Sequence, residues 1–513
     1  MNLRSCVYSI IRIYRGHRRS ARAFGCGSIE RLRQVRPRKR AGMNGRRPKA
    51  ATGDKDYGDK DYGRPHRHSS VVARTAHREE GFMADIVIVG AGLSGTLMAY
   101  EVADQMRADD RLTLVGQGQH YHFVPSNPWV AVGWRERAAI EIDLQPIMAQ
   151  KKIRFETAGA QRIHPAENRL DLEDGTSLSY DYLIIATGPE LAFDEIPGFG
   201  PAHHTHSICQ VGHAEQAYAA FNRLCEKPGP IVVGAAQGAS CFGPAYEFAM
   251  LLDTELRRRG LRDQVPMTFV TSEPYIGHLG LDGVGDTKST LEHELRQRHI
   301  KWITSARVTQ VDADSMTVEE VGQGGAVTAT HRLPHAYAML LPAFRGVEAV
   351  RGVEGLANPR GFILTDAFQR NPAFPNVFAV GVCVAIPPVG PTPVPVGVPK
   401  TGFMIESMVT ATAHNVGALL RGEPVQWKPT LNAICLADFG DGGVAFVAQP
   451  QIPPRNVNWS SEGKWVHVAK IAFEKYFIGK VRRGTSEPFF ERFILDRLNI
   501  RKVKAAPDAA PTL

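Results

Sequence analysis

DIVIVGAGLSG, residues 85–95, is a short apolar run that leads into a glycine turn, and a helical pattern follows over residues 96–107. A turn of this kind between a strand and a helix leaves bare backbone N–H groups at the helix amino terminus, where they can bind a pyrophosphate. The stretch therefore predicts the first turn of a dinucleotide-binding βαβ unit. The glycines that define it are Gly90, Gly92 and Gly95.

The next strand pattern, residues 112–115, continues this unit but departs from the usual fingerprint. An acidic ribose ligand is expected about 20 residues after the glycines. The sequence instead continues with Gly116 and Gln117. We therefore expect Gln117 or backbone atoms to recognise the adenosine.

A second strand-turn-helix unit begins at Pro230, with IVVGAAQGAS over residues 231–240 and a helical pattern over 244–259. Ala236 stands where the second glycine would let phosphate approach the backbone, and its Cβ obstructs that approach. We interpret this unit as an NAD-type fold that no longer binds NAD. Cys241 follows the loop at the expected start of the helix, which predicts a lowered thiol pKa there. The alternative is a small buried residue.

The order of these patterns predicts an α/β protein with two Rossmann-like dinucleotide-binding domains, the second inserted into the first. Strand patterns at residues 178–186 and 377–380 and a helical pattern at 402–420 complete the first domain. The expected boundaries are 83–195 and 345–430 for the discontinuous first domain, 196–344 for the second domain, and 431–513 for a C-terminal region.

Residues 1–82 differ in composition from the rest, with 21 Lys and Arg against 7 Asp and Glu. The net charge of the whole chain is +9, so the remaining residues are mildly acidic. This basic extension carries no apolar period, and we expect a disordered arm, a targeting sequence or a wrongly chosen start. A basic tail on an acidic body does not favour a nucleic-acid partner. Seven cysteines, an odd number, do not predict structural disulfides.

The spacing of apolar residues in the C-terminal region predicts two amphipathic helices, the second of which follows Pro488. No stretch of the sequence predicts a membrane-spanning helix. Basic residues surround them, as in helices that rest on anionic lipid. A helix pair that caps the core or forms a dimer contact is the alternative. The apolar positions of the first helix are Trp465, Val468, Ala469, Ala472, Phe473, Tyr476 and Phe477, and the basic residues are Lys470, Lys475, Lys480, Arg482, Arg483, Arg497, Arg501 and Lys502.

Several further motifs match one family. They are FVPSNPW at 123–129, ATG at 186–188, SEPYIGHLG at 272–280, PKTG at 399–402, and three cysteines in the contexts SIC (Cys209), GASCFGPAYE (Cys241) and NAICLADFGD (Cys435). Together with WVHVAK and SEPFF near the end, they make residues 83–500 resemble the bacterial sulfide:quinone oxidoreductases, which are flavoproteins with two dinucleotide domains.

The resemblance implies bound FAD, a redox-active pair of Cys241 and Cys435 beside the flavin, and Cys209 as a third functional cysteine. It also implies that His213 and His278 line the sulfide side and that Glu247 relays protons, although each histidine can equally be structural. Lys400 would stabilise the anionic reduced flavin. The other cofactor residues would be Gly90, Gly92, Gly95, Gln117, Ala186, Thr187, Gly188 and Gly381.

One departure concerns FAVG at residues 378–381, which is followed by Val382 and Cys383 where related flavoproteins usually carry an Asp. We interpret Cys383 as a packing residue.

The implied reaction transfers electrons from sulfide through cysteine sulfur and FAD to ubiquinone or menaquinone. The quinone would lie between Phe473 and Phe490. The protein would attach to one surface of a membrane, which we expect to be the bacterial inner membrane, with a mitochondrial membrane as the alternative. No metal is expected, and a homo-oligomer is allowed. Alternative functions are an NADH:quinone reductase, the flavin subunit of a flavocytochrome sulfide dehydrogenase, and a flavin-binding sensor without turnover.

Overall fold

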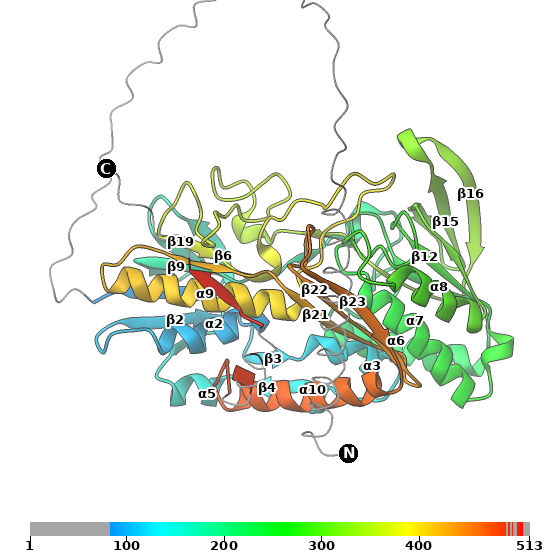
Figure 1. Cartoon of the computed structure of the whole chain (residues 1–513), viewed down its shortest axis with the longest axis horizontal. Coiled ribbons are helices and arrows are strands. Elements are labelled where there is room, and N and C mark those ends of the chain that lie inside the picture. Colours follow the sequence, from blue (N-terminus) through cyan, green and yellow to red (C-terminus); the bar gives the residue numbers. More distant parts are fainter. Residues whose placement is uncertain (1–82, 489–490, 493–494, 496–499, 506–513) are drawn as a thin grey trace, which may run out of the picture. The chain divides into compact units, whose positions relative to one another are not determined.

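The computed structural model describes residues 83–488, 491–492, 495 and 500–505. Its first sheet is parallel throughout, with the strand order β19-β9-β1-β2-β5. Helices α2 (Leu93–Ala103) and α9 (Gly402–Leu420) pack against each other, and Figure 1 shows them as neighbours. The strands are β1 (Asp85–Val89), β2 (Arg111–Val115), β5 (Arg154–Glu156), β9 (Tyr182–Ile185) and β19 (Val377–Ala379).

The second sheet is also parallel and has the strand order β13-β12-β11-β17. An antiparallel sheet, β14-β15-β16, follows it in the chain. These elements are β11 (Ile231–Ala235), β12 (Met267–Thr271), β13 (Ile300–Ile303), β14 (Ala306–Val311), β15 (Ser315–Val321), β16 (Val327–Pro334) and β17 (Tyr337–Leu341), with helices α6 (Val211–Glu226), α7 (Gly243–Arg258) and α8 (Thr287–Gln297).

The first sheet is completed only after the second sheet has ended, because β19 pairs with β9 in the register Val377 opposite Leu183. Buried parallel strands such as β1 and β11 are almost continuously apolar, as expected of strands covered on both faces. The predicted α/β class with two Rossmann-like units, the first one discontinuous, is therefore confirmed. The exact domain boundaries stay a prediction.

Two local predictions can be compared with the structure. The first helix spans Leu93–Ala103 and not residues 96–107, because Gly92 is its N-cap and the chain turns after Ala103. The strand patterns predicted over residues 178–186 are two strands, β8 (Ser177–Ser179) and β9. β8 pairs antiparallel with β7 (Arg169–Leu172), whereas β9 pairs parallel with β1, so the chain changes sheets between them. Helix α9 matches its predicted bounds.

The C-terminal region contributes an antiparallel sheet in the order β21-β22-β23 and helix α10 (Trp465–Arg482). Both α7 and α10 pack against β21, the strand that carries Cys435. These strands are β21 (Ala433–Asp438), β22 (Gly443–Gln449) and β23 (Val457–Glu462). The smaller elements are β3 (His120–His122), α3 (Asn127–Ala131), α4 (Arg137–Ile140), β4 (Glu141–Asp143), α5 (Gln145–Gln150), β6 (Ala160–His164), β10 (Glu190–Leu191), β18 (Phe344–Arg345), β20 (Trp427–Pro429) and β24 (Val503–Ala505).

Helix α10 corrects the prediction that its basic residues surround an apolar face. Lys470, Glu474 and Lys480 are buried in ion pairs, whereas Val468 and Phe473 are exposed. Lys502 is likewise buried, against Glu406 and Glu491. Charged groups are buried only when they are paired, so these lysines hold the helix against the protein. Within the described part of the chain, no helix is long and apolar enough to cross a membrane.

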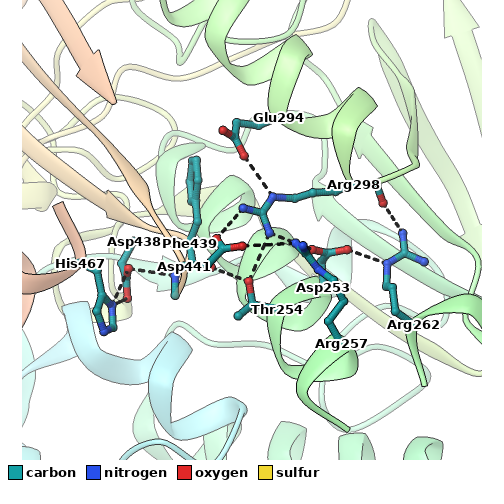
Figure 2. Close-up of polar contacts among 11 residues, drawn as sticks. Asp253, Thr254, Arg257, Arg262, Glu294, Arg298, Asp438, Phe439, Asp441 and His467 are labelled. Atoms are coloured by element: carbon teal, nitrogen blue, oxygen red, sulfur yellow. Dashed lines mark hydrogen bonds and ion pairs between the residues drawn. The ribbon is translucent and has the colours of Figure 1, made fainter. Parts of the chain in front are cut away.

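A cluster of ion pairs fixes the turn that follows Cys435's strand (Figure 2). Arg298, whose side chain is only 7% exposed, donates to Asp253 on α7 (2.8 Å) and to Asp441 in the turn (2.6 Å). It also donates to Glu294 on α8 (3.1 Å). Asp253 is further paired with Arg257 and Arg262. The cluster therefore ties α7, α8 and the β21–β22 turn together.

We expect the substitution Arg298→Met to lower the free energy of unfolding by about 3 kcal/mol, because it removes one partner of buried ion pairs. Equilibrium urea denaturation followed by tryptophan fluorescence measures this change. Arg421→Met is the matched control, since it removes the exposed Arg421–Glu423 pair and should cost about 0.5 kcal/mol or less. Equal effects of the two substitutions would contradict the proposed role of the cluster.

Candidate active site

The first glycine loop leaves open space at the amino terminus of α2. Gly90 has a φ of +110°, and a Cβ at Gly95 would lie 1.6 Å from the carbonyl oxygen of Gly90, so both positions require glycine. A Cβ at Gly92 would meet no atom within 4 Å. Gly92 is the N-cap of α2, and no side chain caps the helix. The loop therefore fits the phosphates of a dinucleotide, which the N–H groups of the helix end would bind.

The other predicted cofactor motifs converge on the same place. Ser94 Oγ donates to the carbonyl oxygen of Ala186 (3.3 Å), the first residue of the ATG motif. A Cβ at Gly381 would lie 2.7 Å from Ser94 Oγ, and one at Gly116 would lie 2.7 Å from the Cβ of Ala91. Gln117, next to Gly116, is exposed. Thr187 and Gly188 follow Ala186 and are half-buried.

The second loop is filled by the protein's own chain. The N–H groups of Ala236 and Gly238 donate to the carbonyl oxygens of Leu341 (2.9 Å) and Pro395 (2.7 Å). Gly397 N donates to Ala239 O (2.8 Å), and a Cβ at Gly397 would lie 2.5 Å from the Cβ of Ser240. The proline-rich segment thus lies next to this loop and accepts the hydrogen bond of Gly238 N, while β17 accepts that of Ala236 N. This agrees with the expectation that the second unit no longer binds NAD.

Lys400 follows the proline-rich segment and is half-buried. Its Nζ lies 4.8 Å from the centre of the Phe362 ring, and no ion pair is found for it among the described residues. Burial lowers the pKa of Lys400 to about 8, and the nearby Cys383 opposes this change. Cys383 is buried in η7 (Gly381–Cys383), and its thiol donates to the carbonyl oxygen of Val380 (3.2 Å).

The three predicted functional cysteines are free thiols, of which Cys209 raises the pKa of Cys241 and Cys241 raises the pKa of Cys435. Burial raises the pKa of Cys241 to about 12, and the nearby Cys209 and Glu247 contribute to the increase. Burial and the nearby Cys241 raise the pKa of Cys435, while Lys470 lowers it. Burial raises the pKa of Cys209 to about 11. The fold therefore brings together three thiols from positions far apart in the sequence.

The prediction that a helix amino terminus lowers the pKa of Cys241 is wrong in this structure. Helix α7 begins at Gly243, two residues beyond the cysteine, with Phe242 as its N-cap. The stabilisation that a helix end provides falls off within one turn, and burial opposes the thiolate more strongly.

Glu247 and Lys470 form a buried ion pair beside these thiols. Burial raises the pKa of Glu247 to about 7, although Lys470 lowers it. Asp438, at the end of β21, raises this pKa by its charge and donates a backbone hydrogen bond that lowers it. The carboxylate of Asp438 accepts hydrogen bonds from Trp129 Nε1 (2.8 Å) and pairs with His467 (2.9 Å; Figure 2). Glu247 can therefore exchange a proton near neutral pH.

Lys470 was predicted among the exposed basic residues of its helix, and the structure buries it. Its spacing with Glu474, Phe477 and Val481 puts two charges on the same stripe as two apolar residues. All four side chains are buried. A mixed stripe of this kind was the available signal for buried ion pairs.

The two predicted histidines lie in different environments. Burial lowers the pKa of His213, on α6 one turn after Cys209, and its Nδ1 is buried without a partner among the described residues. Burial also lowers the pKa of His278, whose Nδ1 accepts a hydrogen bond from Gly280 N (3.2 Å). Both are therefore neutral at pH 7. Asn127, which donates to the carbonyl oxygen of Ile208 beside Cys209 (2.9 Å), also keeps a buried oxygen without a partner.

Phe473 contacts two other aromatic rings, at 5.9 Å from Phe123 and 5.7 Å from Phe477. Phe123 belongs to the predicted FVPSNPW motif, and Val124 beside it is 51% exposed. The second predicted ring, Phe490, lies outside the described residues. The structure thus brings Phe473 to the FVPSNPW segment, at a partly exposed apolar position.

Two parallel dinucleotide sheets and a set of neighbouring thiols define a class of redox protein. Residues 84–414 match the family model described as pyridine nucleotide-disulphide oxidoreductase. This match covers more than half of the chain, so the protein is a member of that class.

The comparison with individual proteins is more specific. The sulfide-quinone reductase of Aquifex aeolicus is 41% identical over 413 residues, which cover 80% of this chain and 94% of the relative. The crystal structure of the sulfide:quinone oxidoreductase from the same organism superposes with a TM-score of 0.79 at 40% identity, over 84% of this chain and 99% of that chain. The chain therefore belongs to the sulfide-quinone reductases.

NDH2 of Plasmodium falciparum, solved in complex with NADH, is more distant. It has a TM-score of 0.61 at 13% identity and covers 81% of this chain and 98% of that chain. This likeness shows the shared fold alone.

In the reduced protein at pH 8, we expect iodoacetamide to alkylate Cys209 about 100-fold and Cys241 about 1,000-fold more slowly than a thiol of ordinary pKa. The raised pKa keeps these thiols protonated, so each unit of added pH should increase the rate about tenfold up to pH 10. Mass spectrometry of the digested protein gives the rates, and the same protein in urea is the control. Alkylation of Cys241 at the same rate with and without urea would contradict the raised pKa.

Proposed function

We propose that the chain binds FAD and oxidises sulfide at Cys241 and Cys435, with a membrane quinone as the electron acceptor. The observation that carries this proposal is that Cys241 lies close enough to Cys435 to raise its pKa, although the two thiols lie 194 positions apart in the sequence. Such a pair releases two electrons when its S–S bond forms and takes up two electrons when the bond breaks. Membership of the sulfide-quinone reductases agrees with this chemistry.

The residues of the first loop fit FAD. Gly92 and the uncapped amino terminus of α2 would hold the pyrophosphate, with Ala186, Thr187, Gly188 and Gly381 close by. Bound FAD supplies a two-electron carrier between the sulfur site and the quinone. Lys400 is half-buried, and no carboxylate pairs with it among the described residues. It would face the negative charge of the reduced flavin ring.

The sulfur chemistry uses a bridge between Cys241 and Cys435. HS⁻ attacks the bridge, so one S–S bond breaks, a new one forms to give a persulfide on one cysteine, and the other cysteine leaves as a thiolate. The persulfide and the thiolate then join into a bridge that is one sulfur longer, which releases one proton and two electrons, and bound FAD would supply the carrier for these two electrons. The two electrons then reduce the quinone, which takes up two protons. Repetition lengthens the sulfur chain until it is released.

Glu247 is the residue we propose as the proton acceptor of this cycle. Its pKa of about 7 lies near the operating pH, which is the condition for an efficient general base. Lys470 holds the carboxylate and also lies close enough to Cys435 to favour its thiolate. His213 and Asn127, with buried acceptor atoms beside the Cys209 segment, can accept S–H hydrogen bonds from H₂S before it loses its proton.

Two further observations bear on the acceptor and the donor. Pro395 takes up the N–H group of Gly238 in the second loop, a donor that a nicotinamide dinucleotide would need, and this disfavours an NADH:quinone reductase. The exposed apolar side chains Val124 and Phe473 would admit a hydrophobic quinone from the lipid and support attachment to one membrane surface. We propose that Phe473 contacts the quinone ring, with Phe490 as the predicted second ring.

The central test is sulfide-dependent bleaching of the flavin in the purified full-length protein. We expect Cys241→Ser and Cys435→Ser to lower the bleaching rate at least 1,000-fold, because neither variant can form the sulfur bridge. Anaerobic stopped-flow absorbance measures the rate. Cys225→Ser is the matched control, since Cys225 is a half-buried thiol on α6 outside the cluster. Full bleaching in either site variant would refute the mechanism.

The second test concerns the membrane. The double variant Val124→Ser, Phe473→Ser should bind about tenfold more weakly to vesicles of phosphatidylcholine and phosphatidylglycerol, because it removes exposed apolar area from the contact. Co-sedimentation measures this binding. Val327→Ser, Leu364→Ser removes two similarly exposed apolar side chains elsewhere and should leave it unchanged. Vesicle binding that the first variant retains in full would show that this surface does not meet the lipid.

A further inference from the structure

Lys400 is a cation whose position is not set by an ion pair. Among the described residues, no carboxylate pairs with it, and its Nζ lies 4.8 Å from the centre of the Phe362 ring. A lysine side chain is long and flexible, so an unpaired one needs a fixed backbone if its charge is to act at one point. The backbone contacts on either side of Lys400 therefore decide where the cation lies.

Gln451 makes those contacts on both sides. Its Nε2 donates to the carbonyl oxygen of Pro399 (2.5 Å), and its Oε1 accepts from Thr401 Oγ1 (3.0 Å). The side chain of Gln451 is fully buried. One amide thus bridges the residue before Lys400 and the residue after it.

Gln451 is itself held by its neighbours. Its N–H donates to the carbonyl oxygen of Leu431 (2.8 Å), four residues before Cys435. Its carbonyl oxygen accepts from Arg455 Nε (2.8 Å), and Arg455 Nη1 donates to Gly283 O (2.6 Å). The amide is therefore a fixed point, connected on one side to the segment that leads to the redox strand β21.

The segment before Lys400 also makes hydrogen bonds with the second glycine loop. Pro395 O accepts from Gly238 N, and Gly397 N donates to Ala239 O. These are backbone bonds that any sequence could make. Gln451 supplies the only side-chain hydrogen bonds to Pro399 and Thr401 that the described residues provide.

We propose that Gln451 is a positioning residue that holds the Lys400 cation against the flavin and thereby raises the flavin's reduction potential. This inference rests on the proposed function, because it assumes bound FAD and Lys400 beside it. A charge acts more strongly on the reduced ring the closer and the better fixed it is, since the interaction falls with distance and a mobile side chain dilutes it. Without Gln451, Lys400 would keep its charge, but its backbone and therefore the position of the charge would be less fixed.

The experiment measures the two-electron midpoint potential of the full-length holoprotein by anaerobic equilibration with reference dyes, in the absence of sulfide and quinone. We expect Gln451→Met, which keeps the size of the side chain and removes both hydrogen bonds, to shift the equilibrium about tenfold toward the oxidised flavin, or about 30 mV. Thr401→Val, which removes one of the two bonds, should shift the potential in the same direction by less. Lys400→Met should shift it further than either.

The double variant Lys400→Met, Gln451→Met separates a positioning role from any other. If Gln451 acts through Lys400, the double variant has the potential of Lys400→Met alone, because the two effects are not additive. Ser315→Ala is the matched control: Ser315 is buried on β15, accepts two hydrogen bonds from Arg332, and lies outside these segments. It should leave the potential unchanged.

An unchanged potential in Gln451→Met beside a lowered one in Lys400→Met would overturn the inference, as would additive shifts in the double variant. Flavin content and far-UV circular dichroism report folding, and Thr401→Val carries the same test if Gln451→Met does not fold. Failure of the proposed function looks different, because the wild-type flavin would then remain oxidised under sulfide whatever its potential.

Discussion

The ion pair between Glu247 on α7 and Lys470 on α10 is the contact on which the arrangement of the site depends. Both charges are buried, and a buried charge that loses its partner is strongly destabilising. The pair therefore obliges α10 to lie where Lys470 reaches α7, and both helices pack against β21 between them. Cys241 precedes α7 and Cys435 lies on β21, so the same constraint keeps the two thiols together.

The two glycine loops show how one supersecondary unit supports different uses. Gly92 faces open space, whereas the equivalent loop of the second unit donates its N–H groups to Leu341 and Pro395 of its own chain. The second loop thus became a structural contact for the segment that ends at Lys400. In this protein the nucleotide-binding geometry of one domain would position a cation for the cofactor of the other.

Helix α10 has three charged side chains inside and two of its apolar side chains outside. Lys470, Glu474 and Lys480 are paired in the interior, and Val468 and Phe473 are exposed. Such a helix stays attached through its ion pairs and leaves apolar area free for lipid or quinone. Lys470 and Phe473 are one turn apart on α10. The helix therefore connects the proposed sulfur site with the proposed quinone site.

The sequence by itself determined the α/β class, the first glycine turn, the α9 bounds, and the residue types needed for thiol chemistry. These depend on local steric rules and periodicity, which a short stretch fully expresses. Only the tertiary structure decided the environments: the raised pKa of Cys241, the inward direction of Lys470, and the bridge that Gln451 makes across Lys400. Burial and long-range pairing set those properties, and both depend on which distant segments meet.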